Sequence, residues 1–266
     1  MTGRARPRFR VSSSLYLGVA GACAFILCVQ VWTATSGISP DFLPRATMVG
    51  GRIVDLLLTP SFRGDIASTL LGWASGLGLA IVIGVPLGIA FGSSPLVYRA
   101  SSTVVEMMRA TPGVALIPLA ILVLGQGLAM KAALVAYATI WPILYNTEYG
   151  VHDVDPIAKQ TARAFGLPPY AVLRYVILPS AAPFTFTGIR VAASIGLIVV
   201  VGAELLAGTG TGIGAYILNA SANGGQMDFV MAGAVIAGLL GVLVNFVFEA
   251  IERRLFAWRQ TVLLDA

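Results

Sequence analysis

Six long apolar runs, separated by polar segments, constrain the fold of this chain more than any other feature. They cover about residues 15–32, 66–91, 112–124, 132–146, 190–206 and 229–248. A helix rises ~1.5 Å per residue, so about 20 apolar residues cross the hydrocarbon core of a bilayer. Since 57% of the 266 residues are hydrophobic and only 11% are charged, the chain cannot form a water-facing surface. We therefore predict an all-α integral membrane protein with six transmembrane helices.

The polar segments suggest a division of the chain into five parts. These are residues 1–14, a basic N-terminus; 15–34, the first transmembrane helix; 35–65, an external loop with a short interfacial helix over 45–58; 66–250, a core of five transmembrane helices; and 251–266, a charged tail. A cleaved signal peptide is the alternative for the first run, but its apolar region usually spans only ~7–15 residues. We therefore predict a retained first helix.

The basic residues favour one orientation of the six helices. If both termini lie in the cytoplasm, thirteen of the seventeen Lys and Arg residues fall on that side. The four on the outer side are Arg45, Arg52, Arg63 and Lys131, the last in a turn predicted over 125–131. Cytoplasmic loops carry an excess of Lys and Arg, so we predict that both termini lie inside. The net charge of +5 then reflects topology and gives no reason to expect nucleic-acid binding.

A polar, basic segment over residues 155–183 has the pattern of a short helix at its start. Asp155 can accept a hydrogen bond from a first-turn backbone N–H, and Pro156 suits the first helical position. Glycine readily adopts the left-handed conformation that closes a helix. We therefore predict a helix that begins at Pro156 and ends at Gly166.

A second short helix is predicted in the same segment, over residues 170–177. Proline removes a backbone donor and clashes with the preceding turn, so Pro179 and Pro183 are expected to stop this helix before the next apolar run. The segment would then be two short helices joined at a glycine elbow. An ordinary basic loop is the alternative.

The spacing in this segment resembles the signature loop of the membrane subunits of binding-protein-dependent ATP-binding-cassette (ABC) importers. That signature is Glu-Ala-Ala, three residues, Gly, nine residues, then Ile, any residue and Leu-Pro. The matching positions here are Gln160, Thr161, Ala162, Gly166, Val176, Leu178 and Pro179. Gln160, Thr161 and Val176 depart from the signature in identity, and Gln160 removes the family's glutamate charge. The resemblance implies a coupling helix that inserts into a groove on an ATP-hydrolysing subunit.

A wider resemblance, to the nitrate, sulfonate and taurine class of these permeases, extends from about Pro40 to Arg254. It rests on short motifs in order: Leu43-Pro44, Gly64-Asp65-Ile66, Pro86-Leu87-Gly88, Arg109 ahead of Pro112, Ile117-Pro118-Leu119, Pro142-Ile143-Leu144 with Asn146-Thr147, Val176 to Pro179, Gly188-Ile189-Arg190, and Ala203 to Ala207.

This resemblance implies a multi-pass protein of the cytoplasmic (inner) membrane. We expect it to pair with a second copy of itself, and a non-identical membrane subunit is the alternative. The resemblance also implies two ATP-binding subunits, which would hold ATP and magnesium, and an extracytoplasmic solute-binding protein. The implied cargo is a small anion such as sulfonate, taurine or nitrate. Pyrimidine precursors and aromatic carboxylates remain alternatives, because related permeases also carry them.

Two groups of small or helix-breaking residues are candidates for helix packing and for the pathway. Gly72, Gly76, Gly84 and Gly88 lie at multiples of four residues, which places them on one helix face where another backbone can approach closely. Static packing is the favoured interpretation over a moving contact. Pro112 and Pro118 interrupt the third apolar run. A broken helix is tolerated at membrane depth only where protein or a water-filled cavity satisfies the freed carbonyls, so this run is a candidate pathway wall. A kinked but fully packed helix is the alternative.

Glu204 is the remaining candidate for a site. It lies fourteen residues beyond Arg190, about 21 Å at helical rise, so we expect it near the outer interface. It could contact a docked binding protein or line an outer gate by pairing with a neighbouring helix. A surface acid that snorkels to the interface is the alternative. The following segment, residues 208–228, is expected to be a flexible external loop with glycine turns.

Several other functions lack the residues they require. ATP binding by a phosphate loop needs Gly-Lys-Ser/Thr, whereas Lys131 follows Met130 and Lys159 follows Ala158. The apolar runs contain no ionisable residue at their centres, which weakens the interpretation as an ion-coupled secondary transporter. With one histidine and no nucleophile–base set, we predict no catalytic, metal or cofactor site in this chain.

Overall fold

The computed structural model describes residues 11–39, 41–208, 210–222, 224 and 226–256. The basic N-terminal arginines at positions 4–10 and Arg259 of the tail lie outside these residues. Within them the chain forms helices joined by short connections, and no strand occurs there. The all-α prediction is therefore confirmed for the part of the chain that the structure describes.

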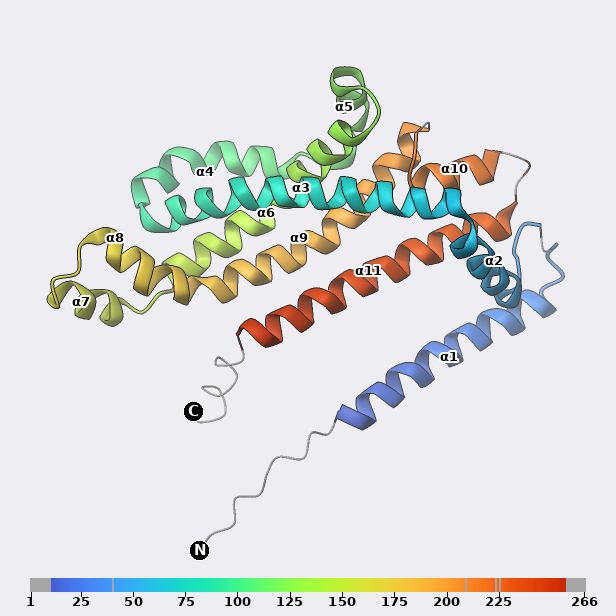
Figure 1. The fold of residues 1–266 in the computed structure, drawn as a ribbon, viewed down its shortest axis with the longest axis horizontal. Coiled ribbons are helices and arrows are strands. Elements are labelled where there is room, and N and C mark those ends of the chain that lie inside the picture. Colours follow the sequence, from blue (N-terminus) through green and yellow to red (C-terminus); the bar gives the residue numbers. More distant parts are fainter. Residues whose placement is uncertain (1–10, 40, 209, 223, 225, 257–266) are drawn as a thin grey trace, which may run out of the picture.

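Long helices alternate with short ones along the chain (Figure 1). In order, the elements are α1 (Val11–Thr35), α2 (Ala46–Leu58), α3 (Pro60–Ser93), α4 (Pro95–Ala110), η1 (Gly113–Leu116), α5 (Ile117–Leu124), α6 (Leu128–His152), α7 (Pro156–Ala164), α8 (Pro169–Val172), η2 (Leu173–Ile177), α9 (Leu178–Ala207), α10 (Ile213–Ala222) and α11 (Met227–Leu255).

Five helical units among the described residues are long and apolar enough to cross a membrane. They are α1, α3, α6, the continuous unit from α8 to α9, and α11. α4 and the η1–α5 segment qualify only together, and they bend by 78° at the break between them. The predicted number of six is reached when this bent pair counts as one span.

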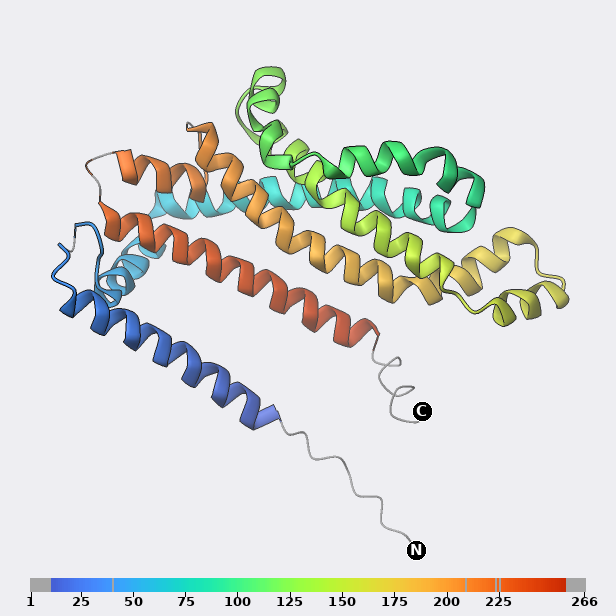
Figure 2. The same cartoon turned by 180° about the vertical axis from the view of Figure 1, so that it is seen from behind.

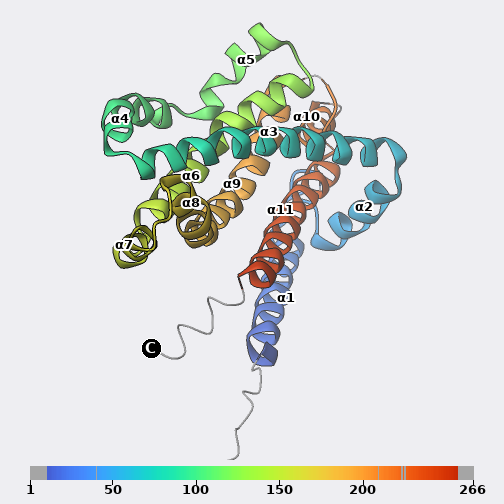
Figure 3. The same ribbon diagram turned by 60° about the vertical axis from the view of Figure 1, so that its left-hand side comes forward.

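α3, α6 and α9 form the centre of the molecule, with α11 beside α9 (Figures 1 and 2). α4 and α5 lie on one side of this bundle and α1 on the opposite side (Figure 3). α1 meets α2, where the Thr47 backbone N–H donates to the Gln30 side chain over 3.2 Å. The short helices gather at the two ends: α7 and α8 at one, which we call the α7 end, and α2 and α10 at the other, the α10 end.

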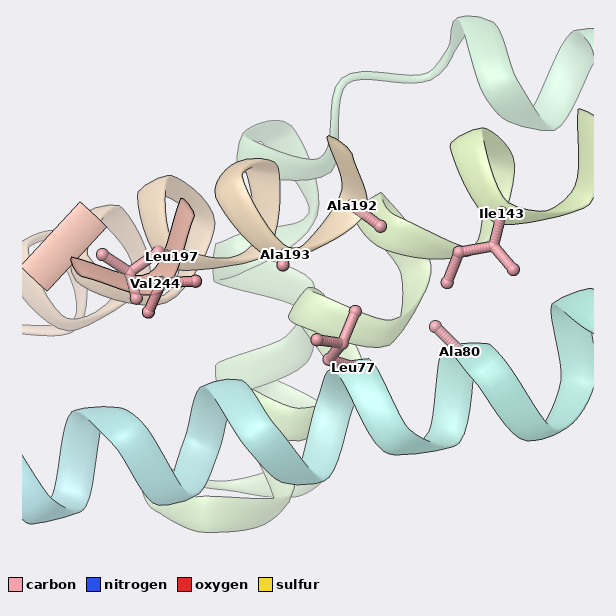
Figure 4. Close-up of a cluster of buried hydrophobic side chains, with 7 residues drawn as sticks. All are labelled: Leu77, Ala80, Ile143, Ala192, Ala193, Leu197 and Val244. Carbon is pink, nitrogen blue, oxygen red and sulfur yellow. The ribbon is translucent and has the colours of Figure 1, made fainter. Parts of the chain in front are cut away.

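A buried apolar cluster joins the central helices (Figure 4). Its members come from α3, α6, α9 and α11 and are Leu77, Ala80, Ile143, Ala192, Ala193, Leu197 and Val244. Small residues are frequent in this cluster. Lipid is as apolar as the side chains of membrane helices, so these helices associate mainly through close van der Waals packing, which small residues allow.

The glycine face of α3 lies directly against α6. A Cβ atom added at Gly76 would lie 2.5 Å from the Val135 Cβ and 2.7 Å from a backbone oxygen, and one at Gly88 would lie 2.6 Å from the Leu144 carbonyl. Gly84 faces α6 at slightly longer distances. These glycines therefore let two backbones approach more closely than any side chain would allow.

The prediction that Pro179 and Pro183 stop the second short helix is wrong. α8 continues through the π-helical turn η2 into α9. Together they form one uninterrupted helix, long enough to cross a membrane, from Pro169 to Ala207. The wide turn changes the hydrogen bonding, since the Leu178 N–H donates to the Leu173 carbonyl. Pro179 lies directly after this turn, where the regular series of α-helical hydrogen bonds is already interrupted, so its missing donor is tolerated. Pro183 alone lies inside α9.

Candidate functional site

The loop at the α7 end begins and ends as its sequence predicts. The Asp155 carboxylate accepts a hydrogen bond from the Ile157 N–H over 2.8 Å and caps the start of α7. At the other end Gly166 has φ +80°, a left-handed conformation that favours glycine. The Leu167 N–H then donates to the Ala162 carbonyl over 3.2 Å, which closes the helix. α7 is thus held in a fixed orientation at the tip of the loop.

The signature positions of this loop fall into two groups. Gln160, Thr161 and Gly166 are exposed on or beside α7, whereas Ala162 is half-buried. Val176 and Leu178 are half-buried and Pro179 is exposed at the turn into α9. The first group can therefore meet another molecule, and the second joins the loop to a membrane-length helix.

The same loop exposes large apolar side chains at the tip of the molecule (Figure 1). These are Ile157, Phe165, Tyr170 and Tyr175, each 66–81% exposed. Apolar side chains gathered at a projecting tip, beside basic residues, are typical of a protein interaction surface. The loop can therefore dock against a partner while α9 carries its position into the bundle.

The break between α4 and α5 contains both prolines predicted for the pathway. Pro112 precedes η1, and Pro118 lies in the first turn of α5, where its missing donor costs little. Both are exposed. Tyr137 of α6 donates its hydroxyl to the Met108 carbonyl over 2.5 Å at the end of α4. Protein therefore satisfies at least one carbonyl freed by this break, as a break at membrane depth requires.

Glu204 lies at the α10 end and is buried. Its side chain has no exposed surface, and its Oε1 lies 2.7 Å from Nζ of Lys131 on α6, which is 5% exposed. The interpretation of Glu204 as a surface acid is therefore wrong, because it pairs with a neighbouring helix. The prediction that Lys131 lies in an external turn is also wrong. α6 begins earlier, at Leu128, and its first turn includes Lys131, which is buried.

Further hydrogen bonds complete this buried pair. The Thr69 hydroxyl lies 3.0 Å and 2.9 Å from the two Glu204 carboxylate oxygens. Nζ of Lys131 donates to the Ser68 hydroxyl over 2.9 Å and to the Thr211 carbonyl over 2.5 Å. We call these five residues, Ser68, Thr69, Lys131, Glu204 and Thr211, the α10-end cluster. Buried charges are stable when paired and hydrogen-bonded in this way.

The segment over residues 208–228 is not the open loop that its sequence predicts. Its glycines do form turns, with positive φ at Gly208, Gly210 and Gly212. They lead into α10, whose first residues Ile213, Gly214 and Ala215 are buried. The segment therefore folds back onto the bundle. Sequence reasoning missed both α10 and the Lys131 partner of Glu204.

α2 is fixed to α11 at this same end. Nε of Arg52 donates to Asp228 over 2.7 Å, and the guanidinium lies 4.4 Å from the centre of the Phe229 ring. The hydrogen bond to Asp228 raises the pKa of Arg52 above its ordinary value. Tyr216 of α10 packs edge-on against Phe62 of α3, and burial raises the pKa of its hydroxyl.

A second charged cluster lies on the α7 side and joins α9 to α11. Arg190 donates to Asn245 over 3.1 Å, to Glu252 over 3.0 Å and to Glu249 over 3.3 Å. We call these four residues the α7-side cluster. Its charged side chains are 28–31% exposed, so they are far less buried than the pair in the α10-end cluster.

No group of three or more His, Cys, Asp or Glu side chains that could hold a metal ion occurs among the described residues. The structure is a bundle of membrane-length helices with a structured, exposed loop at one end and a charged, hydrogen-bonded cluster at the other. These features define a polytopic helical membrane protein.

Comparison with known proteins identifies the family. The family model for the binding-protein-dependent transport system inner membrane component matches residues 80–257. The chain is 30% identical to the taurine transport system permease protein TauC of Escherichia coli, over 97% of this chain and 95% of that protein. It is 28% identical to the nitrate import permease protein NrtB of Leptolyngbya laminosa, over 93% and 94%. A putative aliphatic sulfonates transport permease protein, SsuC of Bacillus subtilis, is 29% identical over 88% and 85%.

Solved structures share the fold. A bacterial ABC transporter involved in alginate import matches with a TM-score of 0.60 at 14% identity, over 91% of this chain and 96% of the matched chain. The MetNI methionine ABC transporter, in inward-facing conformations, matches with a TM-score of 0.58 at 19% identity, over 74% and 99%. The chain therefore belongs to the binding-protein-dependent transport system inner membrane component family, in its nitrate, sulfonate and taurine class of ABC importer permeases.

Proposed function

We propose that this chain is the membrane permease subunit that moves a small nitrate-, sulfonate- or taurine-type anion across the cytoplasmic membrane. Its family membership supports the importer role. The printed names of relatives that match nearly the whole chain support this type of cargo. Pyrimidine precursors and aromatic carboxylates remain the alternative cargo, because the described residues include no side-chain set that selects one anion.

The α7 loop is the proposed contact with a dimer of ATP-binding subunits, which would hold ATP and magnesium. The observation that supports this contact is the exposed apolar surface of Ile157 on the capped helix α7, of Phe165 at its end, and of Tyr170 and Tyr175 on the following turns. A movement of the ATP-binding subunits would be carried from α7 through the continuous α8–α9 helix into the bundle. Such coupling is a free-energy link between two sites, and it needs a connection stiff enough to transmit the change.

The proposed orientation places both termini and the α7 end in the cytoplasm and the α10 end outside. The excess of Lys and Arg in segments near the α7 end supports it. The α10 end would then face an extracytoplasmic solute-binding protein. A second copy of this chain is the proposed partner within the membrane. The exposed apolar residues of α4, η1 and α5, such as Met107, Val114 and Leu122, are consistent with such a contact and with lipid.

Purification from native membranes tests the partners and the cargo together. The protein would be tagged, extracted gently, and analysed by mass spectrometry for associated proteins and retained small molecules. We expect an ATP-binding subunit and a solute-binding protein, with an anion on the latter. Recovery of this chain alone, with transport that continues without ATP, would contradict the proposed function and favour a secondary transporter.

Gly166→Pro tests the coupling role of the α7 loop. Proline fixes φ near −65°, so it cannot adopt the φ of +80° found at Gly166. We expect loss of ATP-binding subunit from the purified complex, or ATP hydrolysis that no longer drives transport. Gly166→Asn is the matched control, because asparagine tolerates the left-handed conformation. Normal transport by the proline variant would count heavily against the coupling role.

A further inference from the structure

The first turn of α10 is held by side chains of other helices. The Gly212 N–H donates to Asp65 over 2.9 Å, and the Ile213 N–H donates to the Thr69 hydroxyl over 3.0 Å. Asp65 and Thr69 are one turn apart on α3. The first N–H groups of any helix lack partners within that helix, so α10 depends on these external acceptors.

The next backbone N–H of α10, that of Gly214, also has a side-chain acceptor, and this acceptor belongs to the buried Glu204–Lys131 pair. The Gly214 N–H donates to a carboxylate oxygen of Glu204 over 3.1 Å. Glu204 thus accepts from α10, accepts from Thr69 of α3 and pairs with Lys131 of α6. One carboxylate on α9 therefore ties four helices together.

The backbone of this segment fits closely around the carboxylate. A Cβ atom added at Gly212 would overlap the Glu204 carboxylate, and one at Gly214 would overlap the Val201 carbonyl. Gly72 provides the same clearance on the other side, where an added Cβ would lie 2.9 Å from the Lys131 side chain. Glycine therefore occurs at three positions where an added Cβ would overlap a neighbouring segment beside the pair.

We propose that Thr69, Lys131 and Glu204 are positioning residues for transport, which latch α10 onto α3, α6 and α9 so that these helices move as one body. This role rests on the function proposed above, in which the α10 end faces the solute-binding protein. Breaking a buried ion pair leaves a charge without its partner, which is costly, so the latch stays closed unless α10 itself is lifted. Closing and opening the α10 end of the pathway would then require movement of the whole unit.

A cysteine placed under α10 reports whether the latch is closed. Ala215 is 2% exposed and borders a cavity of about 280 Å³ beside Lys131 and Glu204, so Ala215→Cys should fit. The native Cys23 and Cys28, both exposed on α1, would first be replaced by alanine. The rate of labelling by a membrane-impermeant maleimide would be measured in intact cells, together with transport and ATP-binding subunit recovery.

Thr69→Val removes the shared hydroxyl and keeps the shape of the side chain, and Thr69→Ser is its matched control. Loss of a buried hydroxyl that accepts from the Ile213 N–H and donates to the Glu204 carboxylate should raise local opening about tenfold, and labelling of the cysteine with it. We expect Thr69→Val to label about tenfold faster and to lose most transport, with normal recovery of the ATP-binding subunit. Thr69→Ser should match the parent in all three measurements.

Two results would overturn this inference. Equal labelling rates for the valine and serine variants would show that no latch is held by Thr69. Faster labelling with full transport would show that the latch has no role in transport. Should Thr69→Val fail to accumulate, Thr69→Ala replaces it, because it removes the same hydroxyl with a smaller side chain; a labelling rate equal to that of Thr69→Ser would have the same meaning.

The proposed function and the latch fail in distinguishable ways. If the parent chain shows no ATP-driven transport, the proposed function fails, whatever the labelling rates. Labelling in inside-out vesicles alone would reverse the proposed orientation. A labelling difference between the valine and serine variants, on either membrane face, would still support the latch as a structural element.

Discussion

The two charged clusters on α9 differ mainly in their access to water. In the α10-end cluster, the Glu204 and Lys131 side chains are 0% and 5% exposed and 2.7 Å apart. In the α7-side cluster, Arg190 is 30% exposed and lies 3.0 Å and 3.3 Å from Glu252 and Glu249. Both sites lie on α9 and have similar distances between their charged groups. The first pair is buried, whereas the second group is partly exposed.

Solvation decides what each cluster can do. A charge that loses its partner in a dry interior stays unpaired, whereas a half-exposed charge exchanges its partner for water at little cost. α9 is therefore fixed to its neighbours at the α10 end, while its contacts with α11 on the α7 side can rearrange. A helix that is fixed at one end and adjustable near the docking loop suits the transmission of movement as a rigid body.

Lys131→Met should produce the largest effect, because it leaves the Glu204 carboxylate buried without a cation. Removal of one partner of a buried ion pair typically costs about 3–5 kcal/mol in the free energy of unfolding. Denaturant-induced unfolding of the purified protein in detergent would measure this cost.

The double variant Lys131→Met/Glu204→Gln is the control for that prediction. Replacing both charges removes the unpaired ion, and the amide oxygen of glutamine can still accept from Gly214, so most of the lost stability should return. A cost below about 1 kcal/mol for Lys131→Met alone would place this pair among exposed salt bridges and remove the contrast with Arg190.

Gly76→Ala and Gly92→Ala test whether helix spacing also differs between the two ends. An added Cβ would lie 2.7 Å from the Ala132 carbonyl at Gly76 and 2.6 Å from the Glu148 carbonyl at Gly92. Backbone atoms cannot move aside, so each substitution should cost about 1–3 kcal/mol in stability, measured by the same unfolding experiment. Gly78→Ala is the control, since nothing lies within 4 Å of its added Cβ.

Equal costs at Gly76 and Gly92 would sharpen the comparison, because the two ends would then differ in electrostatics alone. Tolerance at one of the two positions would mean that α3 and α6 separate there. In that case spacing, and not only solvation, would distinguish the ends.

Local signals allowed much of the fold to be predicted. The cap at Asp155 and the left-handed turn at Gly166 each depend on a few neighbouring residues, so the sequence alone predicts α7 closely. The glycine spacing on α3 likewise predicts a close helix contact, since four-residue periodicity is a property of one helix. The coupling role of the loop and the pathway role of Pro112 and Pro118 remain predictions.

The α10-end cluster could not be predicted because it forms between distant parts of the chain. Glu204 and Lys131 are 73 positions apart in the sequence, and only the packing of α3, α6 and α9 brings them together. A lysine near the start of an apolar run is typical of the membrane interface, so the sequence predicted an external turn for Lys131. The π turn before Pro179 was missed for a related reason, because proline normally signals a helix end and tertiary packing overrode that signal.

Arg190→Gln should have the smallest effect on stability, because water can replace the lost guanidinium. Glu249 keeps Arg253 as a partner, and Glu252 is 28% exposed, so neither carboxylate is stranded. Exposed and half-exposed ion pairs typically contribute about 1 kcal/mol or less.

Added salt screens such charges, so we expect the difference between Arg190→Gln and the parent to shrink when unfolding is measured at high ionic strength. Lys131→Met, measured in parallel, should cost the same at both salt concentrations because its charges are buried. A large, salt-independent cost for Arg190→Gln would mean that the α7-side cluster is as rigid as the α10-end cluster, and α9 would then be fixed at both ends.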